Sequence, residues 1–422
     1  MIKVFKFGGA SVKDGDSVRN AVRVLNLYKG EKLAVVVSAM GKTTNSLERL
    51  LHSCYYSRDK IEEEFNNLKD FHLKIVEDLF PDKSDEIFSE MANIFSIIKG
   101  RVSLPHSDNY DYDYDQLVSA GEIISTRIVS AFLNRAGIEN QWIDARAIIR
   151  TDNTYRESKV DWAKTEELVK NAMDFKDFNV YITPGFIGGT SENMSTTLGR
   201  EGSDFSAAIL AYCLEAEEVI IWKDVPGVLN ADPKYFDNTV KLERLSYYDA
   251  IELAYYGASV IHPKTIKPLQ NKGIPLWVKS FLNPQEIGTV VQTDKAELEV
   301  PSFIFKMNQV LITIAARDFS FIVEQNLRDI FQALSENRVR INVMQNTALS
   351  FSISTDWDER KVLPLISTLE KDYKIKYNMG LELVTIRNYD QATIDRVTVN
   401  KEIILEEKSR NTVQMVMREV SS

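Results

Sequence analysis

Charged side chains beside glycines, at the ends of apolar runs, are the residues of this sequence best suited to chemistry. In Lys6-Phe-Gly-Gly-Ala-Ser11 a lysine ends an apolar run and two glycines follow at once. Because glycine lacks Cβ, the backbone N–H groups of Gly8 and Gly9 can approach an oxyanion closely. A lysine there can neutralise charge on a transferring phosphoryl group. The same pattern also fits a plain strand-turn connection.

The richest cluster is Thr196-Thr-Leu-Gly-Arg-Glu-Gly-Ser-Asp-Phe-Ser-Ala-Ala208. Two glycines flank Arg200, and Ser203 is expected to cap a helix over Ala207–Leu214. Free N–H groups at a helix start, together with a guanidinium, would bind an anion by two independent mechanisms. Asp204 adds a carboxylate, and the upstream glycines of residues 184–189 add more closely approaching backbone.

Glu122 ends a Ser-Ala-Gly-Glu sequence at the front of an apolar helical run. A glutamate in the first turn of a helix is favoured by the helix dipole and needs no further explanation. It could equally hold the ammonium group of a substrate. The sequence leaves both interpretations open.

Two further loops follow apolar runs. Gly41-Lys42-Thr43 resembles part of a P-loop, but Val36 occupies the position of the required first glycine, so we reject that motif. Polar residues, including Ser38 and Thr44, remain at this strand end. The second loop, residues 223–234, is either a nucleotide-phosphate site or a surface turn rich in Asp, Pro and Lys.

The surrounding elements predict how these loops are held. Runs that are apolar on both faces fit a mostly parallel sheet covered by helices, and ligands of such sheets bind beyond the carboxyl ends of the strands. Residues 60–100 have helical spacing. We expect strands at Ile2–Phe7, Leu33–Val37, Val180–Thr183, Val219–Trp222 and Leu276–Val278.

A change of pattern near Pro301 divides the chain into expected domains at 1–298 and 299–422. The order βαββαβ after residue 309 is typical of a split-βαβ module, which we place at about 305–378. A shortened second module would follow at about 379–422, with residues 392–401 too polar and β-branched for a packed helix. We expect strands at Val310–Ala315, Val339–Met344, Leu349–Ser354, Lys374–Tyr377, Leu381–Ile386, Ile403–Leu405 and Val413–Val420, and helices at Asn326–Leu334 and Val362–Leu369.

Composition excludes several classes of protein. A net charge of −10 disfavours a nucleic-acid partner, and no apolar run reaches the roughly 20 residues that cross a membrane. The N-terminus resembles a strand more than a signal peptide, and two cysteines cannot form a disulfide framework, so we expect a cytoplasmic protein. The acidic, tyrosine-rich Asp108–Asp115 is expected to be an exposed loop rather than a metal site.

The order of the motifs makes the chain resemble the aspartate kinases. KFGGAS, SAGE, TTLGREGSDFSAA, DVPGVLNADP and ELAYYGASVIHP occur in that family's order. The resemblance implies the three-layer, carbamate-kinase-like amino-acid-kinase fold with a mostly parallel sheet, followed by a ferredoxin-like ACT regulatory region. It also implies transfer of the γ-phosphoryl group of ATP, with Mg²⁺, to the side chain of L-aspartate, the first step of lysine, threonine and methionine biosynthesis.

The resemblance further implies roles for individual residues. Lys6, Gly8, Gly9 and Asp204 would serve the transferring phosphoryl group, and Ser38, Thr44, Glu122, Arg200 and Ser203 would bind aspartate. Lys223, Asp224, Leu229, Asp232, Lys234 and Ser259 would border the nucleotide, and no side-chain metal ligand is assigned. A lysine is common in the family where Ser259 stands, so Lys223 or Lys264 is expected to replace it.

Regulation and the rival interpretations stay open at this point. The family often forms homodimers through the ACT region, which can bind an amino-acid effector. Lysine-sensitive relatives use an Asp and a Ser-Glu pair where this chain has Asn342 and Thr347-Ala348, so we expect weak or absent inhibition by lysine. The rivals are a kinase of glutamate, N-acetylglutamate or a nucleoside monophosphate on the same fold, and a non-catalytic amino-acid sensor.

Overall fold

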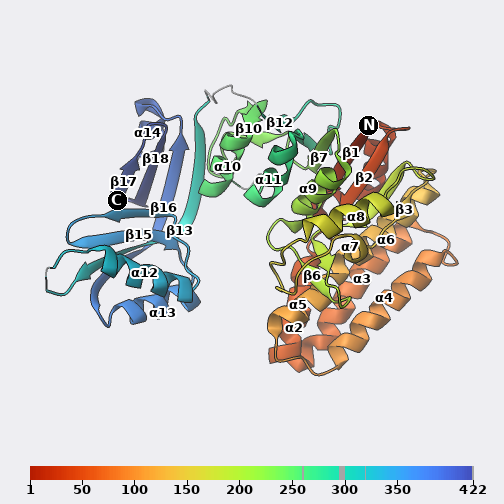
Figure 1. The fold of residues 1–422 in the computed structure, drawn as a ribbon, viewed down its shortest axis with the longest axis horizontal. Coiled ribbons are helices and arrows are strands. Elements are labelled where there is room, and N and C mark those ends of the chain that lie inside the picture. The colour runs from red at the N-terminus through yellow and green to blue at the C-terminus, as the bar shows by residue number, and fades with distance from the viewer. Residues whose placement is uncertain (259–260, 294–299, 319, 421–422) are drawn as a thin grey trace. The chain divides into compact units, whose positions relative to one another are not determined.

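The computed structural model describes residues 1–258, 261–293, 300–318 and 320–420 (Figure 1). They form two compact units. One consists of Met1–Val228, Lys241–Ile251 and Val260–Ala296, and the other of Leu229–Val240, Glu252–Ser259 and Glu297–Ser422. The boundary expected at 298/299 and the limits of the two modules stay predictions.

The first unit is built on an eight-stranded sheet, as expected from the apolar runs. Its order is β10-β12-β11-β7-β1-β2-β4-β3, and every neighbouring pair is parallel except β11 with β12. All five predicted strands are present. The strands are β1 (Ile2–Phe7), β2 (Lys32–Val37), β3 (Gln141–Trp142), β4 (Val180–Pro184), β7 (Glu218–Lys223), β10 (Arg244–Ser246), β11 (Leu276–Ser280) and β12 (Thr289–Gln292).

Helices cover both faces of this sheet and make three layers. The helix α9 packs on β1, β2 and β7 with α8 and α11 beside it, whereas α6 packs on β2, β3 and β4. The helices of this part of the chain are α1 (Gly15–Asn26), α2 (Thr43–Tyr56), α3 (Ile61–Leu79), α4 (Glu86–Ser103), α5 (Tyr110–Val118), α6 (Ala120–Arg135), α7 (Ala145–Ile148), α8 (Trp162–Ala172), α9 (Gly202–Leu214), α10 (Tyr247–Tyr256) and α11 (Pro263–Lys272).

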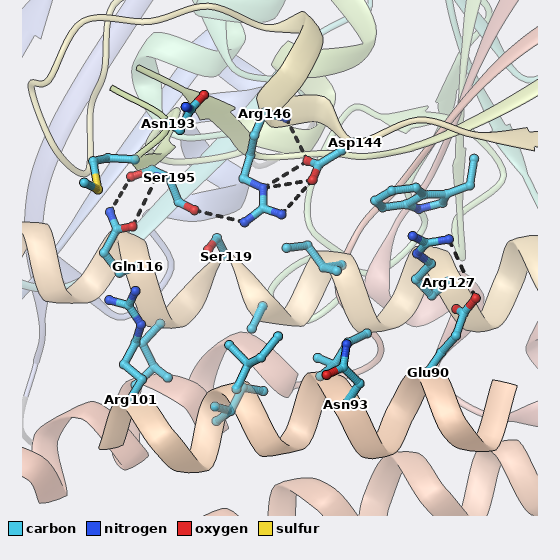
Figure 2. A pocket seen from close by; sticks show the side chains of 18 residues that line it. Glu90, Asn93, Arg101, Gln116, Ser119, Arg127, Asp144, Arg146, Asn193 and Ser195 are labelled. Carbon is cyan, nitrogen blue, oxygen red and sulfur yellow. Dashed lines mark hydrogen bonds and ion pairs between the residues drawn. The ribbon is translucent and has the colours of Figure 1, made fainter. Parts of the chain in front are cut away.

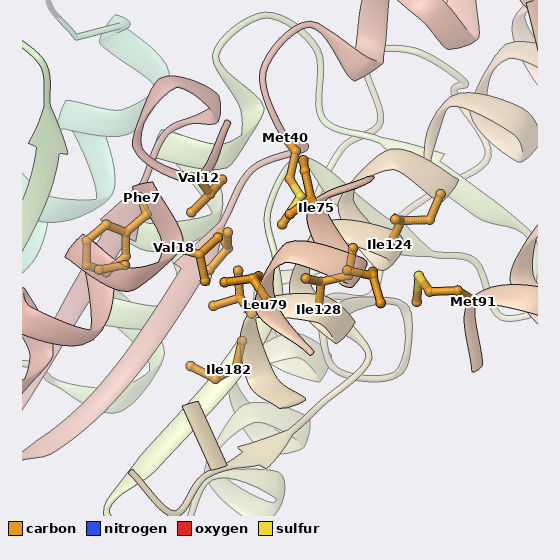
Figure 3. Close-up of a cluster of buried hydrophobic side chains, with 14 of the residues drawn as sticks. Phe7, Val12, Val18, Met40, Ile75, Leu79, Met91, Ile124, Ile128 and Ile182 are labelled. Carbon is orange, nitrogen blue, oxygen red and sulfur yellow. The ribbon is translucent and has the colours of Figure 1, made fainter. Parts of the chain in front are cut away.

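A large hydrophobic core fills the space between the sheet and the helical layer that contains α1 and α6 (Figure 3). Phe7 of β1 and Ile182 of β4 contribute from the sheet, and Val18 and Ile128 contribute from α1 and α6. Side chains alternate between the faces of a strand, so Lys6 points to the opposite side, toward the α9 layer. The core therefore fixes β1 while leaving its last lysine free for polar contacts.

The second unit contains a six-stranded antiparallel sheet with the order β14-β15-β13-β16-β18-β17. The expected βαββαβ order is confirmed by its first six elements. The elements are β13 (Ser302–Ala316), α12 (Glu324–Glu336), β14 (Val343–Asn346), β15 (Ser350–Asp356), α13 (Glu359–Leu369), β16 (Tyr373–Arg387), α14 (Gln391–Val397), β17 (Lys401–Lys408) and β18 (Thr412–Glu419).

Long strands join the two halves of this sheet. The strands expected at Lys374–Tyr377 and Leu381–Ile386 are one continuous strand, β16, and the strand expected at 339–344 is confined to Val343–Asn346. Residues 309–315 of β13 pair with β15 on one side and with the first part of β16 on the other. Residues 302–306 pair with the end of β16, which also pairs with β18. Short strands also occur at β5 (Ile187–Gly189), β6 (Ser195–Thr197), β8 (Val228–Leu229) and β9 (Lys241–Leu242).

Two expectations about local structure were wrong. Asp108–Asp115 is not an exposed loop, because α5 begins at Tyr110 and Asp115 is fully buried. Residues 392–401 do include a helix, α14, whose Ile394 is buried and whose start is held by a capping box of Asp390 and Thr393. Short helices with strong caps escape a search for long apolar periodicity.

Candidate active site

An ion pair between Lys6 and Asp204 lies at the centre of the site. The Lys6 Nζ is 2.6 Å from the Asp204 Oδ1, and their side chains are 11% and 4% exposed. Lys6 is the fifth residue of β1, and Asp204 lies in the first turn of α9, which packs on that strand. The pair therefore joins the carboxyl end of the central strand to the start of the helix above it.

A second lysine reaches the same carboxylate. Lys223 ends β7, the neighbour of β1, and its Nζ lies 3.9 Å from the Asp204 Oδ2. Burial by itself raises the pKa of Asp204, but the charges of Lys6 and Lys223 outweigh burial and hold that pKa below its usual value. One ionised carboxylate thus lies between two ammonium groups at the ends of neighbouring strands.

The loop after β1 approaches the loop after β2 closely. The Gly41 N–H donates to the Gly9 carbonyl at 3.0 Å, and a Cβ at Gly9 would lie 2.8 Å from the Ala39 carbonyl oxygen. Only glycine allows this approach. The backbone of Ser38 is held by the Ser125 hydroxyl, which donates to its carbonyl at 2.7 Å. Gly8, Gly9 and Ser38 are therefore brought together beside Lys6, as the strand-end argument predicted.

Glu122 is buried next to this loop. Its Oε1 accepts the Ala39 N–H at 3.4 Å, whereas its Oε2 is buried and has no hydrogen-bond partner among the described residues. Burial raises the pKa of Glu122 to about 8, although the Ala39 N–H and the charge of Lys6 lower it. A buried carboxylate with an unused oxygen suits a cationic ligand better than the surface role that a first-turn glutamate usually has.

The start of α9 differs from the expectation. The helix begins at Gly202, and Glu201 caps it in a left-handed conformation with φ 53°, so Ser203 is not the cap. The N–H groups of Gly202 and Asp204 donate to backbone carbonyls, so they are not free to bind an anion. Gly202, the first residue of the helix, packs closely on Phe186, since a Cβ there would lie 2.6 Å from that side chain.

The residues expected to bind aspartate are only partly assembled. Ser203 is buried and lies against Gly185. A Cβ added at Gly185 would lie 2.6 Å from the Ser203 Cβ. Thr44 lies in the first turn of α2, directly after the Ser38 loop. Arg200 is exposed, and within the described chain no ion pair joins it to Glu122.

Sequence reasoning missed Asp115. This carboxylate accepts the Thr197 N–H at 2.8 Å, the Thr197 hydroxyl at 2.6 Å and the Arg156 N–H at 2.9 Å. It therefore ties α5 to β6, the strand that leads into Arg200. The alternating Asp and Tyr residues of this segment gave no sign of which aspartate is buried.

The residues expected to border the nucleotide fall in different parts of the chain. Lys223 lies beside Asp204, and Asp224 follows it as an exposed residue of the first unit. Leu229, Asp232 and Lys234 belong to the second unit, where the Lys234 N–H donates to the Asp232 carboxylate at 2.9 Å. Ser259 lies outside the described residues. The Lys264 Nζ donates to the Leu198 carbonyl at 3.4 Å, close to Gly199.

Two kinds of feature are absent from the described residues, a metal-binding cluster and a membrane-spanning helix. In the part of the chain that the structure describes, no group of three His, Cys, Asp or Glu side chains is placed to hold a metal ion. No helix there has the length and apolar character needed to span a bilayer.

The fold and the site together define an α/β domain with a mostly parallel sheet and a lysine cluster at its strand ends, joined to an antiparallel α+β region. The model of the amino acid kinase family matches residues 1–280. The chain therefore belongs to the amino acid kinase family.

Aspartokinases are among the relatives and solved structures that the chain resembles. The chain is 32% identical to Aspartokinase 1, chloroplastic, of Arabidopsis thaliana over 84% of its own length, but it spans 63% of that protein. It is 28% identical to Lysine-sensitive aspartokinase 3 of Escherichia coli, covering 92% of this chain and 87% of that protein. The E. coli aspartokinase III crystal structure with aspartate and ADP has a TM-score of 0.83 at 26% identity, covering 99% and 96% of the two chains. A second E. coli structure contains lysine and aspartate.

Proposed function

We propose that this protein is an aspartate kinase, which transfers the γ-phosphoryl group of ATP to the side-chain carboxylate of L-aspartate and releases ADP. The observation that carries the proposal is the buried constellation of Lys6, Asp204 and Glu122 at the carboxyl ends of the central strands. The similarity to the aspartokinases of Arabidopsis and E. coli supports the same acceptor.

The acceptor explains why so few side chains are needed. A free aspartate side chain has a pKa of about 3.9, so it is already ionised at neutral pH and needs no general base. Catalysis then depends on alignment and on neutralising charge. Lys6 is fixed by Asp204, and it would donate to the phosphoryl oxygens while the backbone at Gly8 and Gly9 approaches them.

Aspartate itself would be held by complementary charges. The unpartnered oxygen of Glu122 would accept the substrate ammonium, and the exposed Arg200 would close on a carboxylate in a bidentate pair, which lysine forms poorly. Ser38, Thr44 and Ser203 would line the space between them. The nucleotide would extend toward Lys223 and Asp224. Leu229, Asp232, Lys234 and Ser259 are nucleotide-side residues by resemblance alone.

Mg²⁺ and regulatory partners complete the proposal. Asp204 offers the hard oxygen ligands that Mg²⁺ prefers, and the ion would neutralise the charge of the ATP phosphates when bound. An amino-acid effector and a homodimer contact are assigned to the second unit. There β14 forms an edge of the sheet, with Met344, Gln345 and Asn346 exposed.

An assay of ADP release tests this function. We expect activity with aspartate, ATP and Mg²⁺, and a fall in kcat of about 10²–10³ in Lys6→Met, as for loss of one donor to a developing charge. Lys3→Met is the matched control, because Lys3 lies on the same strand but pairs with Glu31 and Glu218 at its other end.

Rival acceptors are part of the same assay. Turnover of glutamate, N-acetylglutamate or UMP in place of aspartate would assign a different kinase to the same fold. No ADP release with any acceptor, together with measurable aspartate binding, would leave the protein a sensor.

A further inference from the structure

A cavity of about 500 Å³ lies away from the lysine cluster, in the helical layer of the first unit (Figure 2). Its floor is the end of α5 and the outer side of α6. One wall is α4, and the other is formed by residues 142–146 and the turn at 193–195. On α6 the cavity is lined by Ala120, Ile123 and Arg127, whereas Glu122 turns away to the Ala39 N–H. The cavity is therefore separate from the proposed aspartate site.

Three arginines line this cavity in a chain whose net charge is −10. Arg146 is held by Asp144 at 2.6 Å and donates to the Ser195 hydroxyl at 3.3 Å. Arg127 lies flat on the ring of Trp142, 3.7 Å from its centroid, and its Nη1 is 3.9 Å from Glu90. These contacts fix two guanidinium groups in place.

Arg101 is different. It projects from α4 at the other end of the cavity from Arg127 (Figure 2), is exposed, and makes no side-chain hydrogen bond or ion pair within the described residues. With two carboxylates against three guanidinium groups, Arg101 carries the unbalanced charge of the cavity. It is the group most readily available to an anion.

The space between the arginines is apolar. Ile94, Ile97 and Ile98 of α4 face Leu117 and Ile123 across it, and Ile97 is 62% exposed. Glu90 and Arg101 are 11 positions apart on one helix, so the cavity is about 16 Å long at 1.5 Å per residue. A ligand that fills it needs an apolar body as well as a negative group.

We propose that this cavity is a second binding site, for a small organic anion with an apolar body, whose negative group pairs with Arg101 and whose body packs on the isoleucines of α4. The site is independent of the kinase activity proposed above, so it can be tested without an activity assay.

Two fluorescent probes that differ in charge alone provide the test. 8-Anilino-1-naphthalenesulfonate has an aromatic body and a sulfonate, and N-phenyl-1-naphthylamine is the same body without the sulfonate. We expect the sulfonate probe to bind the parent protein. Arg101→Ala should raise its Kd roughly tenfold and Arg101→Glu should raise it further, as for loss of a charge-assisted hydrogen bond. The neutral probe should bind equally to all three proteins.

Arg23→Ala is the matched control, because Arg23 is an exposed arginine on α1 that does not line the cavity. It should leave the Kd of both probes unchanged. The proposal would be overturned if neither Arg101→Ala nor Arg101→Glu changed the Kd of the sulfonate probe. It would also be overturned if either variant lost affinity for both probes equally. Because Arg101 is exposed, its substitution should not unfold the chain, and circular dichroism of each variant checks this.

Discussion

Glu122 illustrates, at the scale of one residue, how burial prepares a carboxylate for a cation. In the free chain its pKa is raised to about 8 by burial, so it holds a proton at neutral pH. A substrate ammonium favours the ionised form, so binding of aspartate must release that proton below pH 8. We expect the KM for aspartate to rise about tenfold for each pH unit below 8, measured in the ADP-release assay between pH 6 and 9. A KM that is constant over that range would contradict this role.

The variant Glu122→Gln separates binding from folding. Because the folded chain holds this proton up to about pH 8 and the unfolded chain loses it near the ordinary glutamate pKa of 4.5, the free energy of unfolding should fall as pH rises through that window. Glutamine has no such titration. At pH 8.5 the variant should therefore resist urea better than the parent protein while its KM for aspartate is much higher.

At the scale of elements, Asp115 connects α5 to the strand β6 that leads into Arg200. The buried carboxylate of Asp115 accepts three hydrogen bonds. Asp115→Asn should therefore lower the free energy of unfolding by about 1–3 kcal/mol. A purely structural role would change stability alone. We expect the KM for aspartate to rise more than kcat falls, because the Arg200 loop loses its anchor. Steady-state kinetics measure both constants.

The same segment supplies a control. Asp111 is half exposed and lies 3.4 Å from the Arg156 guanidinium, so Asp111→Asn should alter neither stability nor KM appreciably. Equal effects of the two substitutions would show that Asp115 has no special positioning role.

The sequence predicts elements best where one signal is strong. Continuous apolar runs located the central strands, and the rule that parallel strands end at one edge brought Lys6, Ser38 and Lys223 together. Asp115 could not be found, since neighbouring aspartates have the same local pattern and only the approach of β6 distinguishes it. Likewise, the Glu122 Oε2 is left without a hydrogen-bond partner among the described residues because of how α6 packs against the Ala39 loop. The spacing of residues in the sequence does not predict that packing.

At the scale of the whole molecule, regulation depends on the second unit. There Asn342 lies within a closed network, in which its Nδ2 donates to Gln309 at 2.8 Å and to Asp356 at 3.0 Å. The Lys306 Nζ donates to its Oδ1 at 2.8 Å. The polar atoms of Asn342 are thus engaged by the chain itself, one of them by an internal lysine.

We therefore expect lysine at millimolar concentration to leave the aspartate kinase activity within about twofold of its value without effector. The residues at 342, 347 and 348 supply no carboxylate, and the Asp356 carboxylate of the network already accepts hydrogen bonds from Asn342 and Gln309. A lysine ammonium would have to displace these contacts or be buried without an ion-pair partner, and either is costly. Titration of lysine, threonine and methionine in the ADP-release assay measures this, and Asn342→Ala, which removes the network's central amide, is the companion variant. If millimolar lysine inhibited the parent protein and Asn342→Ala relieved that inhibition, lysine would be shown to bind at this network.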